Sequence, residues 1–246
     1  MLEEIKLTKA HASGNDFIFI LENLFLNENQ ILRICDRNFG IGCDQLLIFR
    51  KQITIDNSRH LYFDVYNSDS SMAGMCGNAM RCIVGLFLNE NEHIFVNISD
   101  NLVKLSRENN FAWVQMPEIK IEKDFINIGN LHKVFVIDDL NIVDKNSSSE
   151  YNKSYVKILK NDEIFIATIE RGAGETYACG SGICASVYYC RVNNLISSNK
   201  IKIHTKGTEK SEFYGKSDEI FIEINKNQTT LIGNWNIVAR DIKFLI

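Results

Sequence analysis

The sequence predicts an α+β protein built from two similar halves, and two observations lead to this fold class. The first is the number of short segments rich in β-branched and aromatic residues, which are typical of strands. These segments are Phe17–Leu21, Leu46–Phe49, Leu61–Tyr66, His93–Ile98, Phe111–Gln115, Val134–Ile137, Ile164–Ile169, Ile201–His204 and Ile220–Ile224. Helical patterns are fewer and cover Gln30–Asn38, Gly77–Asn89 and Gly180–Asn193.

The second observation is an internal repeat with a long period. Gly14–Ile20 resembles Gly129–Val136, and Met75–Cys82 resembles Ala178–Cys184. The offsets are 129 − 14 = 115 and 179 − 76 = 103 residues, and the order is the same. Chance similarity between short glycine-containing strings is the alternative. Duplication predicts two homologous halves joined near Pro117, with residues 1–116 and 117–233 as the halves and 234–246 returning to the first.

The two later helical segments each follow a Cys-Gly pair. Their apolar residues recur at helical spacing, which predicts helices buried largely on one side. These residues are Met80, Ile83, Val84 and Phe87 in the first segment, and Ile183, Val187 and Tyr188 in the second.

Composition excludes several classes of protein. The 246 residues are 45% hydrophobic and 24% charged, with a net charge of −4 and no long single-sign run. A basic footprint for nucleic acid is therefore missing. Apolar runs are far shorter than the roughly 20 residues that span a bilayer. Met1–Glu4 is acidic and lacks an apolar signal core, so we expect a cytoplasmic protein without membrane contact.

The seven cysteines do not form C-x-x-C pairs, which disfavours a metal site. A reducing cytosol keeps such thiols free, and most free cysteines are small buried residues. We expect this of Cys35, Cys43, Cys82, Cys184 and Cys190.

Cys76 and Cys179 differ because each directly precedes a predicted helix. The first amides of a helix lack partners within it and favour an anion. A cysteine at this position can have its pKa lowered to about 3.5–7.5. The following glycine lets the backbone approach a bound group closely, and nearby N–H groups could hold a carboxylate.

Two such thiols facing one cleft suit the inversion of a carbon centre. A thiolate removes the proton from one face while the opposing thiol delivers one to the other. With neither metal nor cofactor as electron sink, oriented dipoles in a dry site must stabilise the carbanion. The nearby polar residues are Asn67, Asn78, Ser181 and the pair Glu170-Arg171.

Longer motifs point to a family. They are Gly14-Asn15-Asp16-Phe17, Gly40–Gln45, Asn67 onward to Met75–Cys82, Gly129–His132, and the block Glu170–Gly182. In these strings the chain resembles diaminopimelate epimerases, and the resemblance runs from residue 9 to about 240. It implies a strongly curved, mostly antiparallel sheet wrapped around a central helix in each half, with the active site in the cleft between them.

The resemblance also implies an activity and residue roles. It implies a cofactor-independent epimerase that interconverts LL- and meso-diaminopimelate for lysine and peptidoglycan precursor biosynthesis. Cys76 and Cys179 match the acid–base pair, supported by His132 and Glu170, although His132 could also be structural. The matched substrate-binding positions are Asn15, Gln45, Asn67, Gly77, Asn78, Asn130, Asn152, Glu170, Arg171, Gly180 and Ser181.

Some positions depart from the family pattern. Ser70 and Ala79 each replace a glycine, and Leu131 replaces a proline, so the local backbone is in question. The segment Asp138–Tyr155 is short. A homodimer is compatible with the resemblance, but Ala239 stands where many members carry an interface aromatic.

Three alternatives remain. A proline or hydroxyproline racemase shares the fold and the two thiols, but usually has histidine after the first Cys-Gly, where this chain has Asn78. The pair Glu170-Arg171 also favours a longer substrate. A non-catalytic binding protein would not need both cysteines, and a redox or metal protein would need C-x-x-C spacing.

Overall fold

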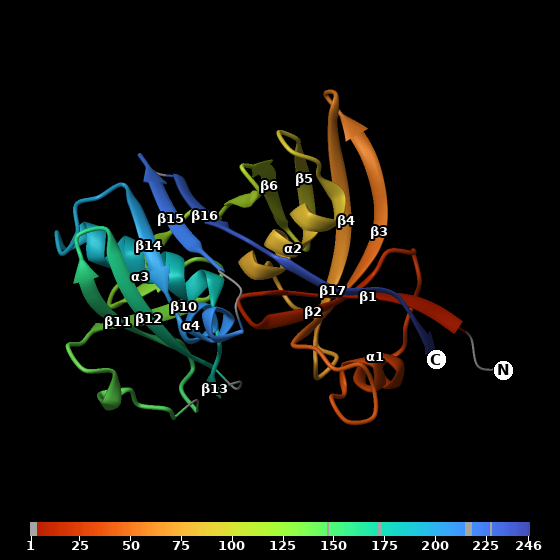
Figure 1. Cartoon of the computed structure of the whole chain (residues 1–246), viewed down its shortest axis with the longest axis horizontal. Coiled ribbons are helices and arrows are strands. Elements are labelled where there is room, and N and C mark those ends of the chain that lie inside the picture. Colours follow the sequence, from red (N-terminus) through yellow and green to blue (C-terminus); the bar gives the residue numbers. More distant parts are fainter. Residues whose placement is uncertain (1–3, 147, 172–173, 215–217, 227) are drawn as a thin grey trace.

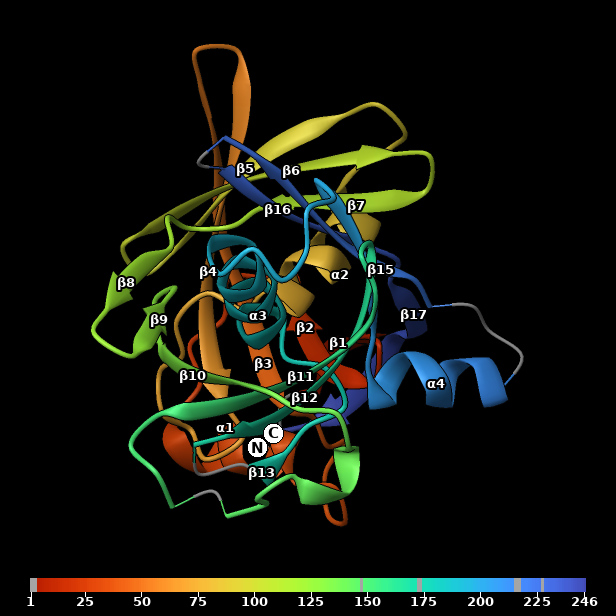
Figure 2. The ribbon, with the colours of Figure 1, turned by 90° about the vertical axis from the view of Figure 1, so that its left-hand side faces the viewer.

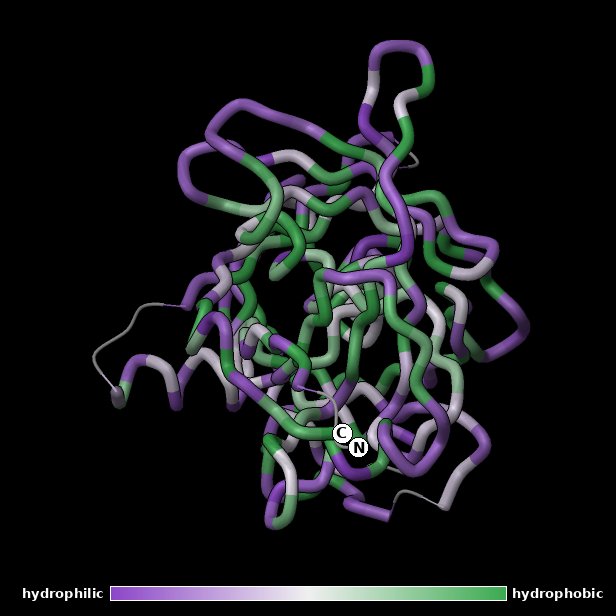
Figure 3. Tube along the Cα trace, turned by 90° about the vertical axis from the view of Figure 1, so that its right-hand side faces the viewer, coloured by the Kyte–Doolittle hydropathy of each residue, from purple (hydrophilic) through white to green (hydrophobic). Residues whose placement is uncertain are grey.

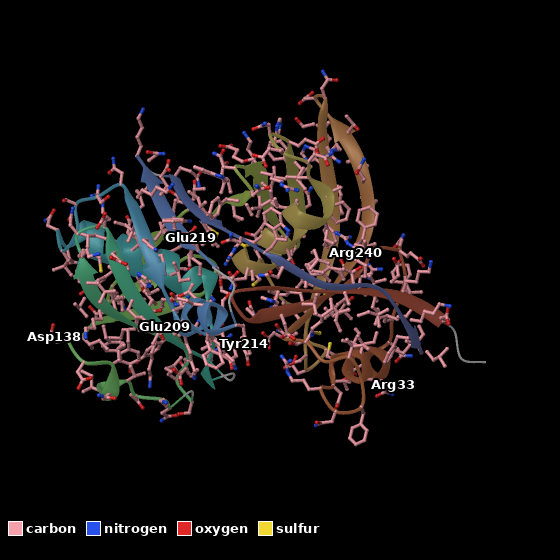
Figure 4. All side chains as sticks on the ribbon, viewed as in Figure 1. Arg33, Asp138, Glu209, Tyr214, Glu219 and Arg240 are labelled. Carbon is pink, nitrogen blue, oxygen red and sulfur yellow. The ribbon has the colours of Figure 1, made fainter. Side chains whose placement is uncertain are left out.

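The computed structural model describes residues 4–146, 148–171, 174–214, 218–226 and 228–246. Two lobes lie side by side along the long axis, and both termini lie at the same end (Figure 1). Arg33 and Asp138 lie toward opposite ends of this axis, and side chains fill the space between the ribbons (Figure 4). Met1–Glu3 of the N-terminal segment and Gly172-Ala173 of the Glu170–Gly182 block lie outside the described part of the chain.

The first lobe contains seven strands and two helices. Its elements are β1 (Glu4–Ala12), β2 (Asn15–Ile20), α1 (Glu28–Cys35), β3 (Gln45–Ile55), β4 (Ser58–Asn67), α2 (Gly77–Phe87), β5 (His93–Ile98), β6 (Asn101–Glu108) and β7 (Phe111–Gln115).

The second lobe follows the same plan with small additions. Its elements are β8 (Lys120–Glu122), β9 (Phe125–Asn127), β10 (Leu131–Val136), the 3-10 helix η1 (Leu140–Ile142), β11 (Asn152–Lys160), β12 (Glu163–Glu170), β13 (Gly174–Glu175), α3 (Gly180–Val192), β14 (Lys200–His204), α4 (Lys206–Phe213), β15 (Ile220–Asn225) and β16 (Gln228–Gly233). The last strand, β17 (Asn236–Leu245), crosses back to the first lobe (Figure 1).

Strand pairing repeats between the lobes. From β1 to β7, successive neighbours pair antiparallel, parallel, antiparallel, parallel, antiparallel and antiparallel. The same six senses recur through β9, β10, β11, β12, β14, β15 and β16. The predicted α+β fold with two pseudo-symmetric halves is therefore confirmed, with the chain duplication visible in its hydrogen bonding.

Two pairings join the lobes into one sheet system. The last strands of the two repeats, β7 and β16, pair antiparallel with Val114 opposite Leu231. β17 pairs antiparallel with β1, with Leu7 opposite Ile242, so the C-terminal strand completes the first lobe. We propose that the halves are residues 1–116 and 117–233, with 234–246 returning to the first half.

α2 and α3 lie inside their curved sheets. α3 is seen in Figure 2 surrounded by strands of its lobe, and the most hydrophobic stretches of the chain lie in the interior (Figure 3). The expectation that each helix is buried on one side is wrong. In α2 every residue from Gly77 to Val84 is buried, including Asn78 and Arg81, because the sheet wraps around the helix instead of lying under it.

All nine strands and all three helices predicted from the sequence are present, but the sequence did not predict the other strands or α4. α1 begins earlier than expected because Asn27 caps it, with reciprocal side-chain and backbone hydrogen bonds to Gln30. α4 was missed since it has no apolar stripe and buries only Gly207 and Thr208. The available signal was its capping box from Thr205 to Thr208.

The departures from the family pattern are accommodated locally. Ser70 takes the left-handed conformation of a turn glycine, with φ +69°, and its N–H donates to the Asn67 carbonyl at 3.0 Å. Ala79 is fully buried in the first turn of α2. Leu131 begins β10 and pairs with Asn127, so proline is not needed to start this strand.

We predict that Gly182→Ala destabilises the fold by about 1–3 kcal/mol, as overpacking does. A Cβ at Gly182 would lie 2.7 Å from Thr168 Oγ1 and 3.1 Å from Ser154 Oγ, whereas the repeat-equivalent position already holds Ala79. Urea unfolding measures the loss. In a Thr168→Ala background the same change should cost less than about 0.5 kcal/mol, because the clashing side chain is gone. Additive losses would contradict the steric origin.

Candidate active site

The amino ends of α2 and α3 meet where the two lobes touch. Cys76 and Cys179 are the N-cap residues, both with extended backbone. A Cβ on Gly180 would lie 3.4 Å from the Gly77 Cα, so the two Cys-Gly turns abut. Asn78 Nδ2 donates to the carbonyl of Ala178 at 2.8 Å and fastens one turn to the other.

The Cys76 thiol faces an amide that comes from the β1–β2 turn. Its Sγ donates to Asn15 Oδ1 over 3.7 Å, and Asn78 Nδ2 donates to the same oxygen at 3.3 Å. Asn15 Nδ2 donates to Asp44 Oδ2 at 2.6 Å, which fixes the amide so that its oxygen points toward the thiol.

The Cys179 thiol lies at the end of a chain of polar side chains. Gly182 N–H donates to its Sγ at 3.4 Å, and Ser181 Oγ lies 3.4 Å from the sulfur. Ser181 Oγ is 3.0 Å from His132 Nε2, and His132 Nδ1 is 3.2 Å from Ser154 Oγ. A thiol, a hydroxyl and an imidazole are thus connected in sequence.

His132 is fully buried on β10, and polar groups surround its ring. Its Nε2 lies 3.1 Å from Asn130 Oδ1 and 3.4 Å from Asn152 Nδ2. Burial lowers the pKa of His132 to about 4, so the ring is neutral at physiological pH. A neutral imidazole can accept a hydrogen bond from a neighbouring hydroxyl.

Both thiols are harder to ionise than ordinary cysteines. Burial raises the pKa of Cys76 to about 11 and the pKa of Cys179 well above its usual value. The expectation of lowered thiol pKa values is therefore wrong for the unliganded protein. Helix amides do act in the expected direction, Ala79 and Asn78 on Cys76 and Gly182 on Cys179, but desolvation outweighs them.

Glu170 links the two thiols electrostatically. Its negative charge raises the pKa of Cys76 and also that of Cys179, after the larger effect of burial on each. Burial raises the pKa of Glu170 itself, against hydrogen bonds with Thr176 and Cys179. Thr176 Oγ1 donates to Glu170 Oε1 at 2.7 Å. The carboxylate thus opposes ionisation of both thiols, whose Cys-Gly turns abut.

The remaining predicted residues lie at the ends of equivalent strand pairs in the two lobes, β3–β4 and β11–β12. Gln45 Nε2 donates to Asn67 Oδ1 at 3.0 Å across the β3–β4 pair, and Gln45 Oε1 is buried without a partner among the described residues. Asn152 and Glu170 lie one residue beyond the β11–β12 pair Lys153–Ile169. Arg171 is exposed and gives its N–H to Asn152 Oδ1 at 2.8 Å.

Sequence reasoning missed the ionic support behind Asn15. Arg37 donates to Asp16 Oδ1 and to Asp44 Oδ1, each at 2.7 Å, and Lys9 pairs with Asp16 at 2.5 Å. Although burial opposes it, the hydrogen bonds from Arg37 and Lys9 lower the pKa of Asp16 to about 2. Asp16 and Asp44 were visible inside the quoted motifs, but nothing in the sequence showed that they share Arg37.

The described residues contain neither a metal-binding cluster nor a membrane-spanning helix. No group of three or more His, Cys, Asp or Glu side chains in that part of the chain is arranged to hold a metal ion. None of its helices has the length and hydropathy of a membrane span.

Comparison with known sequences agrees with the geometry. A family model described as diaminopimelate epimerase matches residues 7–117. A diaminopimelate epimerase of Pelagibacter ubique is 32% identical over 78% of this chain and 85% of its own length. One from Vesicomyosocius okutanii is 30% identical over 89% of this chain and 94% of its own.

The chain belongs to the diaminopimelate epimerase family. Cys76 lies inside the matched family model. Cys179 lies beyond it, but the longer match to the relative from Vesicomyosocius okutanii, which covers 89% of the chain, spans both cysteines because neither is near a terminus.

Solved structures of low identity share the fold of this diaminopimelate epimerase family member. A PhzF-family phenazine biosynthesis protein of Bacillus anthracis superposes with a TM-score of 0.71 at 10% identity, over 99% of each chain. A hydroxyproline epimerase of Agrobacterium vitis, with trans-4-hydroxy-L-proline bound, gives 0.68 at 8% identity, over 99% of this chain and 93% of its own.

We predict that His132 makes stability fall between pH 6.5 and about 4. In this window the unfolded chain protonates the histidine and the folded chain does not, so acid favours unfolding. The shift corresponds to about 3 kcal/mol at the acid end. Urea unfolding across this range should show a slope that His132→Gln reduces and His93→Gln, at an exposed position, does not. Identical slopes in wild type and His132→Gln would contradict the assignment.

Proposed function

We propose that this chain interconverts LL- and meso-diaminopimelate without pyridoxal phosphate or a metal, using Cys76 and Cys179 as the acid–base pair. The observation that carries the proposal is the meeting of two helix starts, each capped by a cysteine, around one carboxylate, Glu170. A two-thiol site of this kind suits inversion at a carbon whose acidic proton is removed from one face and replaced on the other.

The proton movements balance within the site. One sulfur, as thiolate, takes the α-proton and becomes a thiol, while the opposite thiol protonates the other face and becomes a thiolate. The reverse reaction exchanges their roles. Burial disfavours both thiolates, so the α-ammonium of the substrate is the charge that favours ionisation of its neighbour. Ser181 links Cys179 to His132 through contacts of 3.4 Å and 3.0 Å, so the imidazole orients the hydroxyl beside this thiol.

The carbanion is stabilised by fixed dipoles. The amides of Gly77, Asn78, Gly180 and Ser181 lie in the first turns of two helices whose positive ends converge. A carboxylate bound there gains charge as the α-proton leaves, and both helix ends then stabilise it more strongly. Exclusion of water strengthens this effect because the local dielectric constant is low.

The rest of the substrate is matched by the strand-end residues. Buried Gln45 Oε1 can accept from an ammonium group, as can Asn67 and the Glu170 carboxylate. Exposed Arg171 can bind a carboxylate through its planar fork. Asn15, Asn130 and Asn152 complete the amide lining. Two charged ends recognised in this way require a substrate longer than proline.

The biological setting follows from the substrate. We propose a cytoplasmic enzyme of lysine and peptidoglycan precursor biosynthesis whose ligand is a small molecule, with nucleic acid and membrane playing no part. A homodimer is retained as a prediction that sedimentation analysis can measure.

A hydroxyproline- or proline-type racemase is the second candidate, favoured by one observation. The solved hydroxyproline epimerase superposes with a TM-score of 0.68 at 8% identity. Asn78 and the Glu170-Arg171 pair support the longer substrate instead. A non-catalytic binding role would leave the two N-cap cysteines without a purpose.

We predict that Cys76→Ser and Cys179→Ser each lower the turnover of LL-diaminopimelate by more than 1,000-fold, the order of loss seen when a catalytic acid–base group is removed. Serine is a far weaker acid than cysteine at the same place. Polarimetry or a coupled assay of meso-diaminopimelate measures the rate. Cys190→Ala, at a buried cysteine away from the helix starts, is the control and should retain turnover. Near-normal rates in either active-site variant would refute the two-thiol mechanism.

We also predict that the enzyme exchanges the α-proton of diaminopimelate with solvent deuterium and leaves proline unlabelled. The thiol protons equilibrate with D2O, so every inversion delivers deuterium to the α-carbon. Proton NMR follows the loss of the α-signal. Exchange of proline with equal efficiency would favour the second candidate, and absence of exchange with both would exclude an epimerase of either type.

A further inference from the structure

Arg81 is a buried cation that the mechanism above does not use. It lies on α2, is fully buried, and is the largest of the side chains with no exposed surface. Arginine is rarely so buried unless it is paired with an acid. Among the described residues, however, no carboxylate lies within ion-pair distance of its guanidinium.

The guanidinium of Arg81 instead joins three segments at the junction of the lobes. Its Nη1 donates to Asn78 Oδ1 at 3.0 Å, and its Nη2 donates to Ser13 Oγ in the β1–β2 turn at 3.3 Å. Its Nε donates to the carbonyl of Asn234, between β16 and β17, at 2.9 Å. Space for the fork exists because Gly233 has no side chain, since a Cβ there would lie 2.7 Å from Nη2.

The contact with Asn78 decides which way that amide faces. Because Oδ1 accepts from Arg81, Nδ2 must point away, toward the Ala178 carbonyl at 2.8 Å and Asn15 Oδ1 at 3.3 Å. A flipped amide would set two donors against each other. The chain of donors thus runs from Arg81 through Asn78 to both Cys-Gly turns, since Asn15 contacts Cys76 and Ala178 precedes Cys179.

The charge of Arg81 also affects the two thiols differently. Burial lowers the pKa of Arg81 to about 10, so it remains a cation at neutral pH. The titratable groups that act on it are Cys82, Asp218 and Cys76. At the repeat-equivalent position, 81 + 103 = 184, the second half has the neutral, fully buried Cys184. A buried cation therefore acts on Cys76, against the carboxylates of Glu170 and Asp44, and it has no counterpart at the matching position of the second half.

We propose that Arg81 is a positioning residue for the two thiols: it holds the Asn78 amide in the orientation that joins the turns, and its charge makes Cys76 the thiol that ionises first. The step is loss of the Cys76 proton to solvent, with the resulting thiolate stabilised through space by the guanidinium. The proposal rests on the proposed function for its effect on turnover, but its effect on thiol ionisation is independent of any substrate.

Alkylation of the unliganded protein tests the charge. Iodoacetamide reacts with thiolates, and peptide mapping gives the rate at Cys76 and at Cys179 for each pH from 7 to 11. In the wild type we expect Cys76 to react first. In Arg81→Met the pH midpoint at Cys76 should rise, as it does when an opposite charge is removed, with Cys179 little changed. Arg81→Lys, which keeps the charge, should restore the Cys76 midpoint.

Arg59→Met is the matched control, because Arg59 forms a partly exposed ion pair with Glu92 at 3.0 Å, away from the thiols. It should leave both midpoints and the turnover unchanged. A folded Arg81→Met protein whose Cys76 midpoint equals that of the wild type would overturn the role of the charge. So would faster alkylation at Cys179 than at Cys76 in the wild type.

A double-mutant cycle with diaminopimelate tests the positioning role and keeps it testable should Arg81→Met not fold. Arg81→Lys should lower kcat by about 10–100-fold by misplacing the amide, with a smaller change in KM. In an Asn78→Ala background the same change should cost less than about 2-fold, because the residue it acts through is gone. Equal losses in both backgrounds would overturn the positioning role. If the wild type does not turn over diaminopimelate, the proposed function fails, while the alkylation result still decides the role of Arg81.

Discussion

The head-to-head meeting of two buried helix ends is the constraint on which the other features of the site depend. The positive ends of α2 and α3 converge where Gly180 and Gly77 touch, which concentrates positive partial charge at one place. Glycine allows the approach, and the bond from Asn78 to Ala178 holds it. An anion between the helices stabilises such a site, and this is the role that we propose for a substrate carboxylate.

Duplication explains how the chain builds such a site, and divergence explains why its two sides differ. Strand register makes Phe17, Leu47 and Val65 of the first half equivalent to His132, Ser154 and Thr168 of the second. The first set is apolar and fully packed, whereas the second forms a polar column beside α3. The same divergence explains why position 182 is a glycine. Thr168 and Ser154 occupy the space that the Ala79 methyl group fills at the equivalent position of the first half.

The sequence predicted nine of the strands, the duplication and the Cys-Gly helix starts because each leaves a recognisable pattern in the sequence. Periodicity could not show that both central helices are enclosed on all sides, since enclosure depends on how far the sheets curve. For the same reason it could not show that Arg81 and Asn78 of α2 are fully buried. The shared ion pairs of Arg37 with Asp16 and Asp44 were equally invisible, because they join residues that only the fold brings together.

The wrong expectation for the thiol pKa values has a physical cause that bears on function. Helix amides lower a thiol pKa while desolvation raises it, and at both helix starts desolvation has the larger effect. Burial therefore opposes the same amides that were expected to produce a thiolate. A dry site is also what lets those amides stabilise a carbanion, since their effect grows as the dielectric constant falls. Ionisation then depends on the charge that the ligand brings and on any buried cation nearby. A site with thiols that stay neutral until substrate arrives gains protection from stray oxidation and alkylation, because the thiolate is the reactive form.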